Sequence, residues 1–218
     1  MLNQNHTPKK FVILISGRGS NMQAIVKMAK QRDDIEIVAV ISHKANSAGL
    51  AWAAEQGIAT AEILHKSYLS REEYDAALRD LVLSYNPDYV LLAGFMRILT
   101  PVFITPFADR LINIHPSILP SFTGLDTHER AIEKGVKIHG CTVHFVTPVL
   151  DDGPIIAQAV VPVLDGDDAD TLGVRVLTME HKVYPAVVDY LSKGLLGVEG
   201  KKVTYKEKVK TLFVYEGC

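Results

Sequence analysis

An amide and an imidazole stand two residues apart in an apolar stretch of the sequence, as Asn113 and His115 of the segment LINIH. In a β-strand, residues i and i+2 face the same side, so both side chains would project together. Pro116 follows at once and lacks the N–H group that strand pairing needs, which predicts that the strand ends there. An amide can donate to a developing oxyanion, and an imidazole can move a proton near neutral pH. The pair therefore predicts chemistry at a carbonyl group.

The same two residues could instead have structural roles, with His115 as a hydrogen-bonded core histidine and Asn113 as the cap of a neighbouring turn. Two polar side chains that face one way in an apolar strand favour the functional interpretation. A carboxylate that orients the ring and favours its protonated form would complete the site. Asp151 and Asp152, in the sequence LDDGP, are candidates, although Asp-Asp-Gly-Pro is also ordinary turn composition.

A second candidate site begins after the apolar residues 11–15, where the sequence SGRGSN leads into a helical pattern. Small residues let backbone N–H groups approach an anion, and the N-terminus of a helix adds partial positive charge. This segment therefore predicts a phosphate site. In the alternative interpretation, Gly17 and Gly19 only make a tight turn, and Ser20 or Asn21 only caps the helix.

The same loop does not match the fingerprint of dinucleotide-binding proteins, which argues against a nicotinamide dehydrogenase. The fingerprint would need a third glycine at the position of Met22. It would also need an acidic residue about 20 residues further on, where Ser42 and His43 follow the second predicted strand.

The sequence HGCTVH brings His139, Cys141 and His144 close together along the chain, as in some zinc sites. On a strand, however, His139 and Cys141 would face one side and His144 the other, so the three could not converge on one ion. No serine or cysteine lies in an elbow motif such as G-x-S-x-G, which argues against a covalent acyl-enzyme. We therefore expect neither a bound metal nor a covalent intermediate.

Strand-like and helical patterns alternate in the segments that must position these residues. Short, β-branched apolar runs predict strands buried on both faces at residues 11–15, 35–41, 89–93 and 111–115. Helical periodicity predicts helices at 47–56, before Gly57, and at 71–85, where Ser70 and Glu73 form a capping-box pattern. The alternation predicts an α/β fold with a mostly parallel, twisted sheet and helices on both faces. Ligands collect at the carboxyl ends of such strands, where both candidate sites lie.

The pattern changes after residue 115. A loop that contains proline and glycine is followed by a short helix near 128–134 and by strands at 141–146 and 155–163, with antiparallel pairing in this C-terminal part. A closing helix at about 170–193 would be kinked by Pro185. The remaining tail alternates only weakly and could form an edge strand or a loosely attached arm.

Composition limits the class of protein. The 218 residues are 48% hydrophobic and 22% charged, as in ordinary globular proteins with a sizeable core. A net charge of −2 without a long lysine or arginine run argues against a general nucleic-acid or membrane-surface role. No stretch approaches about 18 uninterrupted apolar residues, the N-terminus lacks a signal-peptide core, and two distant cysteines give no disulfide framework. We expect a cytoplasmic protein.

Five segments in combination, ISGRGSN, LAGFMRIL, NIHPSILPSFTG, GCTVHFV and LDDGPII, resemble the folate-dependent formyltransferases in order and spacing. The likeness runs from about residue 11 to residue 192, and SGRGSN is typical of the phosphoribosylglycinamide formyltransferase branch. The resemblance implies a Rossmann-like formyltransferase fold. It also implies direct transfer of a formyl group from 10-formyltetrahydrofolate, as a cosubstrate, to the primary amine of glycinamide ribonucleotide in de novo purine biosynthesis.

The resemblance also implies roles for individual residues. Asn113 and His115 would stabilise the oxyanion, while Asp151, favoured over Asp152, would orient His115 and keep it protonated. The residues that would bind glycinamide ribonucleotide are Arg18, Gly19, Ser20 and Asn21 at its phosphate and Glu180 near its glycinamide end. The residues that would line the folate pocket are Arg71, Met96, Arg97, Ile98, Leu99, Asn113, Thr147, Val149 and Leu150.

On the same basis, residues 1–200 would form one formyltransferase domain, with a phosphate-binding half at about 1–100 and a folate-binding and catalytic half at about 101–200. Residues 201–218 would form a C-terminal arm. Two features depart from the family pattern. The loop SFTG at 121–124 lacks the basic residue that many relatives carry, and Asp126 stands where relatives often have histidine or asparagine.

Three other functions are alternatives to formyl transfer onto glycinamide ribonucleotide. A transfer RNA formyltransferase would add a large C-terminal nucleic-acid-binding domain, and a formyltetrahydrofolate hydrolase would add an N-terminal regulatory domain. A non-catalytic module could hold folate or a phosphorylated metabolite in the same crevice, but it would have no need of Asn113, His115 and Asp151 together. The expected partners are therefore two small molecules, with no nucleic acid or membrane, in a monomer or homodimer.

Overall fold

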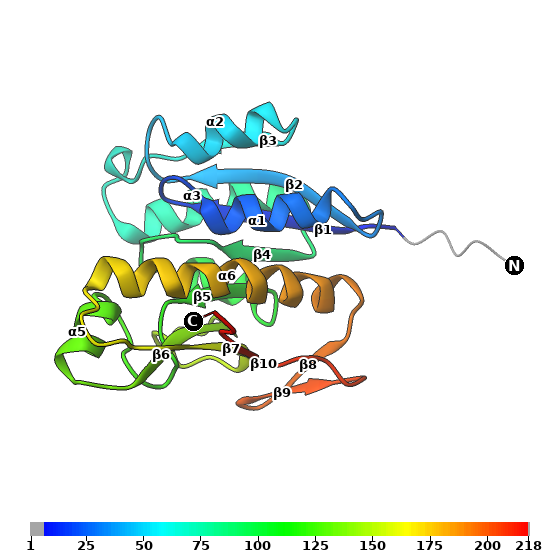
Figure 1. Cartoon of the computed structure of the whole chain (residues 1–218). Coiled ribbons are helices and arrows are strands. Elements are labelled where there is room, and N and C mark those ends of the chain that lie inside the picture. Colours follow the sequence, from blue (N-terminus) through cyan, green and yellow to red (C-terminus); the bar gives the residue numbers. More distant parts are fainter. Residues whose placement is uncertain (1–6, 218) are drawn as a thin grey trace, which may run out of the picture.

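The computed structural model describes residues 7–217, which form an eight-stranded sheet between layers of helices (Figure 1). In order across the sheet, the strands are β10 (Leu212–Val214), β7 (Ile155–Pro162), β6 (Ile138–Phe145), β5 (Leu111–His115), β4 (Tyr89–Leu92), β1 (Lys9–Ile15), β2 (Ile35–Ser42) and β3 (Ala59–Glu62). Strand β6 is antiparallel to both of its neighbours, and the other neighbouring pairs are parallel. The predicted α/β fold, with a mostly parallel sheet and an antiparallel part toward the C-terminus, is confirmed.

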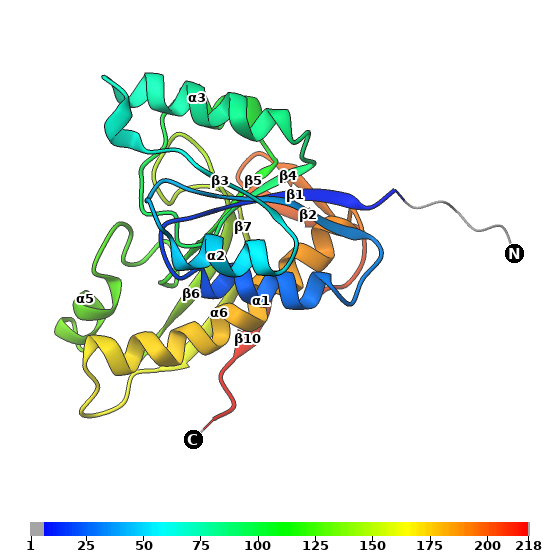
Figure 2. The ribbon, with the colours of Figure 1, turned by 90° about the horizontal axis from the view of Figure 1, so that it is seen from above.

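Helices cover both faces of this sheet, as Figure 2 shows from above. One face carries α1 (Ser20–Ala29), α2 (Ala48–Glu55), α5 (Thr127–Glu133) and α6 (Ala169–Ser192). The other face carries α3 (Arg71–Ser84) and the short α4 (Pro101–Ile104), with 3-10 turns at His65–Ser67 and Thr105–Phe107. Pro185 lies inside α6, which continues past it to Ser192. Within residues 7–217, no helix is long and apolar enough to cross a membrane.

Strand β1 shows why residues 11–15 are continuously apolar. Phe11, Ile13 and Ile15 belong to the core cluster on the α1 and α6 side of the sheet. Val12 and Leu14 belong to the cluster on the α3 side. Because successive side chains point to opposite faces and both faces are covered, every residue from Phe11 to Ile15 is removed from water.

Three local features differ from the sequence predictions. The sequence did not predict β3, because its residues are mostly exposed and show no apolar alternation. It also did not predict α4, a single turn that begins at Pro101. Ser70 does cap α3, accepting from the N–H of Glu73 at 3.1 Å, but the Glu73 carboxylate accepts from the N–H of Leu69, so the reciprocal half of the capping box is absent.

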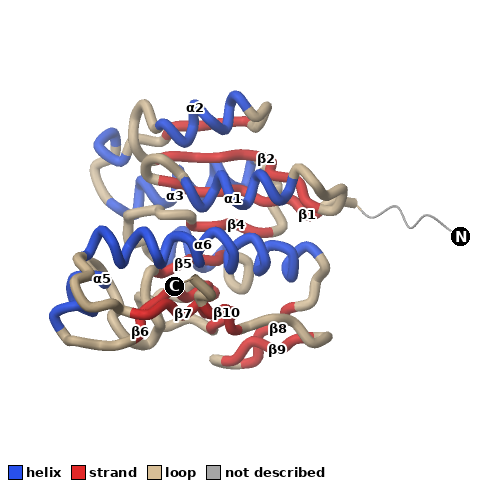
Figure 3. The backbone as a smooth tube through the Cα atoms, in the orientation of Figure 1, coloured by secondary structure: helices blue, strands red, loops and turns tan. Residues whose placement is uncertain are grey.

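The C-terminal residues contribute to two sheets. Strands β8 (Leu196–Glu199) and β9 (Lys202–Tyr205) pair with each other beside the β10 edge of the main sheet (Figure 3). The hydroxyl of Tyr205 donates to the carbonyl oxygen of Ile156 at 2.6 Å and so ties β9 to β7. Strand β10 pairs in parallel with β7. Within residues 201–217, the chain therefore adds one strand to each sheet.

Helix α6 is bonded to the centre of the sheet by one buried hydroxyl. Tyr184 is fully buried, and its hydroxyl lies 3.1 Å from the carbonyl oxygens of both Leu92 and Ile112. These carbonyls belong to β4 and β5, the strands that lead to the candidate catalytic edge. The hydroxyl thus links the longest helix to β5, which carries Asn113 and His115, and to its neighbour β4.

We predict that Tyr184→Phe lowers the free energy of unfolding by about 1 kcal/mol, because a buried hydrogen bond is lost while the ring still fills its space. Urea denaturation would measure the change. Tyr190→Phe is the matched control, since its hydroxyl bonds to the Lys210 carbonyl at a less buried position, and we expect less than about 0.5 kcal/mol. A Tyr184→Phe protein as stable as the unmodified chain would show that the hydroxyl does not stabilise the fold.

Candidate active site

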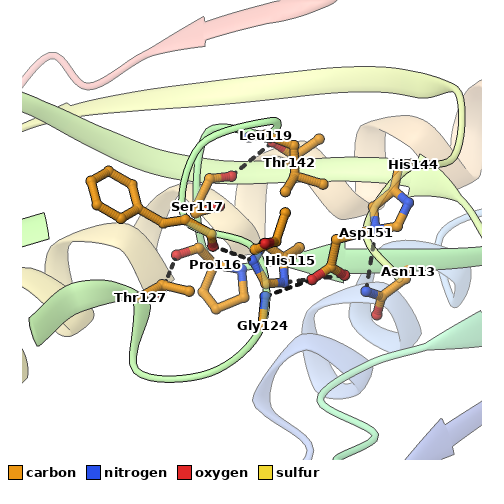
Figure 4. Close-up of polar contacts among 12 residues, drawn as sticks. Asn113, His115, Pro116, Ser117, Leu119, Gly124, Thr127, Thr142, His144 and Asp151 are labelled. Carbon is orange, nitrogen blue, oxygen red and sulfur yellow. Dashed lines mark hydrogen bonds and ion pairs between the residues drawn. The ribbon is translucent and has the colours of Figure 1, made fainter. Parts of the chain in front are cut away.

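Strand β5 ends with the polar pair that the sequence singled out, and Figure 4 shows this pair beside Asp151. His115 is buried, and Asn113 is half-buried. Asp151 comes from the connection between β6 and β7, which is far from β5 in the sequence but adjacent to it in the sheet. Three side chains from two segments therefore meet at the carboxyl end of β5.

The ring of His115 lies between two oxygen atoms. Its Nε2 is 2.9 Å from the carbonyl oxygen of Phe122. Because a carbonyl can only accept, Nε2 carries a proton and donates it. Its Nδ1 is 3.6 Å from Oδ1 of Asp151, which is too far for a hydrogen bond but close enough for an ion pair when the ring is protonated, and the two side chains are only 7% and 6% exposed. Nδ1 is therefore the ring nitrogen that faces the carboxylate.

Asp151, and not Asp152, is the carboxylate beside the imidazole. Oδ2 of Asp151 accepts from the backbone N–H of Gly124 at 2.8 Å, which joins the loop after β5 to the loop after β6. Asp151 has a left-handed backbone with φ of 52°, a conformation that aspartate adopts more often than most residues. Asp152 pairs instead with Lys201 at 2.7 Å. The structure thus separates two neighbouring aspartates that turn composition could not distinguish.

Side chains from β6 hold the loop that supplies the Phe122 carbonyl. The fully buried Thr142 donates to the carbonyl oxygen of Ser117 at 2.7 Å and accepts from the N–H of Leu119 at 3.0 Å. Ser117 in turn donates to the carbonyl oxygen of Ser121 at 2.6 Å. These bonds connect β6 to the residue before Phe122, so the carbonyl that meets His115 is held in place by the neighbouring strand. Sequence reasoning missed this carbonyl, since every residue carries one.

Asn113 is oriented by a histidine on the neighbouring strand. Its Nδ2 is 3.3 Å from Nε2 of His144, the residue opposite it in the β5–β6 pairing. Burial lowers the pKa of His144, and its Nδ1 donates to the Phe145 carbonyl at 2.9 Å, so Nε2 carries a lone pair and accepts from the amide. Asn113 therefore does not cap a turn, and its second amide proton is available to another acceptor. The sequence had no signal for this role of His144, because only the strand register places it there.

The candidate phosphate loop leads from β1 into α1. Gly19 is the N-terminal cap of α1, with φ of 67°, and no side chain caps this helix. The carbonyl oxygen of Gly17 accepts from the Ser47 hydroxyl at 2.7 Å and from the N–H of Gly49 at 3.0 Å. A Cβ at Gly49 would lie 2.7 Å from that oxygen, so only glycine lets α2 approach so closely. The start of α2 holds the loop, and the first N–H groups of α1, which have no acceptor within the helix, are available to an anion.

The side chains of this loop divide between solvent and core. Arg18 is exposed, Ser20 is the half-buried first residue of α1, and Asn21 is buried. Nδ2 of Asn21 donates to Oε2 of Glu180, on α6, at 2.6 Å. Burial raises the pKa of Glu180, and the bond from Asn21 opposes that rise. The alternative in which Ser20 or Asn21 caps α1 is wrong, and Oδ1 of Asn21 has no partner within residues 7–217.

Two loops expose apolar side chains at this edge of the sheet. One loop follows β4, and the other connects β6 to Asp151. Their exposed apolar residues are Met96, Ile98, Val149 and Leu150. The loops share a core, because Val146 at the start of the second packs on the cluster that includes Phe95 and Leu99 of the first. Exposed apolar groups next to buried polar ones are typical of a small-molecule binding site.

Two arginines lie at the loop after β4. Arg71, the first residue of α3, donates to the carbonyl oxygen of Ile98 at 2.6 Å. The guanidinium of Arg97 lies 4.6 Å from the centre of the Tyr74 ring, in a cation–π contact. In the second loop, the hydroxyl of Thr147 donates to the Val149 carbonyl at 3.2 Å. Arg71 and the segment 96–99, which the sequence assigned to one pocket, are thus in contact.

An arginine of α5 contacts the loop at 121–124, which has no basic residue of its own. Nη1 of Arg130 donates to the carbonyl oxygen of Thr123 at 2.6 Å and to that of Leu125 at 3.2 Å. Asp126 occupies the N-terminal cap position of α5, with φ of 54°, but its side chain makes no cap bond. The positive charge beside this loop therefore comes from α5.

His139 and His128 form a pair behind the loop that carries Phe122. Nε2 of His139 lies 3.1 Å from Nδ1 of His128, and the His139 ring packs edge-on against Phe122 with centres 5.8 Å apart. Burial lowers the pKa of His139 to about 4, and the charge of His128 adds to this effect. Within residues 7–217, no three His, Cys, Asp or Glu side chains are grouped to hold a metal ion.

Comparisons with known proteins agree on one family. The family model described as formyl transferase matches residues 9–188. The chain is 50% identical over 186 residues to the phosphoribosylglycinamide formyltransferase of Escherichia coli (strain K12), covering 85% of this chain and 88% of that protein. It is 46% identical over 203 residues to the trifunctional purine biosynthetic protein adenosine-3 of Homo sapiens, covering 91% of this chain and 20% of that protein. The crystal structure of glycinamide ribonucleotide transformylase 1 from Symbiobacterium toebii superposes with a TM-score of 0.91 at 42% identity, covering 95% of this chain and 98% of that one.

We predict that the free energy of unfolding falls as the pH is lowered from about 6.5 toward 4. The folded state holds His139 neutral, with a pKa of about 4, whereas the unfolded chain takes up a proton below its ordinary value of 6.5. The stability is present above the unfolded pKa and is lost as the pH falls through the folded one. Each such proton contributes at most about 1.4 kcal/mol per pH unit.

Urea unfolding of the unmodified chain and of His139→Gln, between about pH 7 and 5, would measure this dependence. The variant keeps a polar group beside His128, but residue 139 can no longer titrate. The slope of its free energy of unfolding against pH should therefore be smaller, by the equivalent of up to one bound proton. Equal pH slopes for the two proteins would show that His139 is not neutral in the folded state.

Proposed function

The chain belongs to the formyl transferase family, and we propose that it transfers the formyl group of 10-formyltetrahydrofolate to the primary amine of glycinamide ribonucleotide. The names of its relatives support this substrate. The observation that carries the proposal is the arrangement of Asn113, His115 and Asp151 at the carboxyl end of β5. In this proposal the reaction is a step of de novo purine biosynthesis in the cytoplasm, with two small molecules as partners and no metal.

The mechanism of formyl transfer follows from the N–H groups of Asn113 and His115 that are available to the substrate. The neutral amine attacks the formyl carbon, so that a C–N bond forms and the carbonyl oxygen becomes an oxyanion. The second amide N–H of Asn113 and the N–H at Nδ1 of His115 form hydrogen bonds to that oxygen without transferring their protons, and such donors typically lower a barrier by about 2.7–4 kcal/mol each. Asp151 balances the charge of the protonated ring. His115 then gives its Nδ1 proton to the folate nitrogen as the old C–N bond breaks, and it takes up the proton that the amine loses.

The nucleotide binds, in this proposal, along the start of α1. Its phosphate is held by the side chain of Arg18 and by Gly19, Ser20 and Asn21, where free N–H groups and the positive end of the helix favour an anion. Its glycinamide end lies near Glu180. The Glu180 carboxylate, which Asn21 holds by its bond from Nδ2, supplies an acceptor for its N–H groups.

The folate occupies the apolar surface between the two loops next to Asp151. This surface, with the polar groups at its margin, consists of Met96, Ile98, Asn113, Thr147, Val149 and Leu150, and the same segment includes the buried Leu99. Arg71 and Arg97 supply positive charge at the same pocket, and Arg71 also holds the backbone of Ile98. Because the folate gives up its formyl group, it is a cosubstrate that leaves after each turnover.

An assay with purified protein tests the reaction directly. We expect loss of the formyl group from 10-formyltetrahydrofolate when glycinamide ribonucleotide is present, with one formylated nucleotide formed for each tetrahydrofolate. Without the nucleotide, the formyl group should stay on the folate, because only the amine is positioned to attack. Loss of the formyl group without nucleotide would instead indicate a hydrolase, and binding without turnover would indicate a non-catalytic module.

We predict that Asp151→Asn lowers kcat by at least about tenfold, because the neutral amide cannot balance the charge on the ring of His115. Asp152→Asn is the matched control, since it makes the same chemical change one residue away, where the partner is Lys201. We expect this control to keep kcat within about a factor of two, as for most surface substitutions. Steady-state rates across pH would measure both variants, and an equal loss in the two would show that the position of the carboxylate does not matter.

A further inference from the structure

One serine hydroxyl connects the ends of three neighbouring strands. Ser16 follows β1, His43 follows β2, and Met96 lies in the loop after β4. Oγ of Ser16 is 2.8 Å from Nε2 of His43 and accepts from the backbone N–H of Met96 at 2.6 Å. Ser16 and His43 are both buried. Because β4, β1 and β2 are adjacent in the sheet, these bonds run across its carboxyl edge.

The direction of each hydrogen bond follows from the donors present. The Met96 N–H can only donate, so Ser16 accepts from it and donates its own proton to His43. Nε2 of His43 must therefore carry a lone pair. Burial lowers the pKa of His43 to about 4, and the positive charges of Arg97, His65 and Lys44 add to this effect, so the ring is neutral at neutral pH and remains an acceptor.

His43 is itself held by its neighbours. Its ring packs edge-on against Phe95, with centres 5.1 Å apart, and lies 5.8 Å from the ring of His65. Its Nδ1 is buried without a partner among the described residues 7–217. An unpartnered buried N–H is unfavourable, and an apolar side chain of similar size would avoid it. The imidazole at this position is therefore explained by its bond to Ser16 and not by packing alone.

We propose that Ser16, oriented by His43, is a positioning residue for the loop segment Met96–Leu99 and hence for the formyl-folate that binds there. This inference rests on the proposed function. The segment is anchored at two backbone atoms, since Ser16 holds the Met96 N–H and Arg71 holds the Ile98 carbonyl. Between these anchors, the exposed side chains of Met96 and Ile98 face the bound ligand.

The same serine begins the loop that continues into the phosphate site. Its hydroxyl therefore sets the distance between the segment that holds the folate and the loop that holds the nucleotide. Without it, the Met96 N–H would have no acceptor, and of the two backbone anchors only the bond from Arg71 would remain. The phosphate loop would still be held by Ser47 and Gly49, which bond to the Gly17 carbonyl. Loss of the hydroxyl should therefore affect folate more than nucleotide.

Ser16→Ala and His43→Leu test this role. We expect the KM for 10-formyltetrahydrofolate and the Kd for tetrahydrofolate to rise by about tenfold, as for loss of one acceptor of a buried N–H. The KM for glycinamide ribonucleotide and kcat should stay within about threefold. The side-chain carbonyl of His43→Gln can accept from Ser16, so this variant should bind folate more tightly than His43→Leu. We expect this difference in affinity although the two variants have the same Tm.

Ser42→Ala is the matched control. Ser42 is as buried as Ser16 and ends β2, but among the described residues its hydroxyl bonds only to the backbone of Lys44, so folate binding should not change. Unchanged tetrahydrofolate binding in Ser16→Ala, or equal weakening in Ser42→Ala, would overturn the proposal. If His43→Leu does not fold, Ser16→Ala decides, because it removes a single oxygen atom. Titration with tetrahydrofolate needs no turnover, so weaker binding in Ser16→Ala supports this inference even if the unmodified protein fails to transfer the formyl group.

Discussion

His115 is held between a carbonyl oxygen and a carboxylate, and the geometry of the candidate site depends on this arrangement. Because the Phe122 carbonyl accepts the proton of Nε2, Nδ1 is the nitrogen that meets Asp151 and can take part in chemistry. The two acceptors come from different loops, which the N–H of Gly124 joins by its bond to Asp151. Ring, carbonyl and carboxylate therefore keep one another in place, and a shift of either loop would move the reactive nitrogen.

These loops use backbone conformations that most residues seldom adopt. Phe122, Asp126 and Asp151 all have left-handed backbones, which costs an L-residue roughly 1–2 kcal/mol each. Tertiary hydrogen bonds offset this cost, since Thr142 bonds to two backbone groups of the loop before Phe122 and Gly124 bonds to the Asp151 carboxylate. Three of the six left-handed non-glycine residues among residues 7–217 thus lie in the segments that supply the partners of His115.

The parallel sheet brings the rest of the site to the same edge. Helix α6 packs beside α1 and carries Glu180 to Asn21, although 159 residues separate the two in sequence. The start of α2 holds the phosphate loop through Gly49, and Ser16 connects that loop to the segment after β4. Both proposed substrates therefore meet surfaces built from several elements, and their relative placement depends on contacts between elements more than on any single loop.

The sequence by itself determined the strands buried on both faces, the main helices and the polar pair at the end of β5, because periodicity and proline act between neighbours along the chain. Turn composition left Asp151 and Asp152 equivalent, since adjacent turn residues have the same composition whichever way each side chain points, and only the family resemblance favoured Asp151. It was silent on His144 and on the Phe122 carbonyl, because register and loop path place them. Only the tertiary structure decided these contacts, since each joins atoms that are distant in the chain and meet only when the sheet has formed.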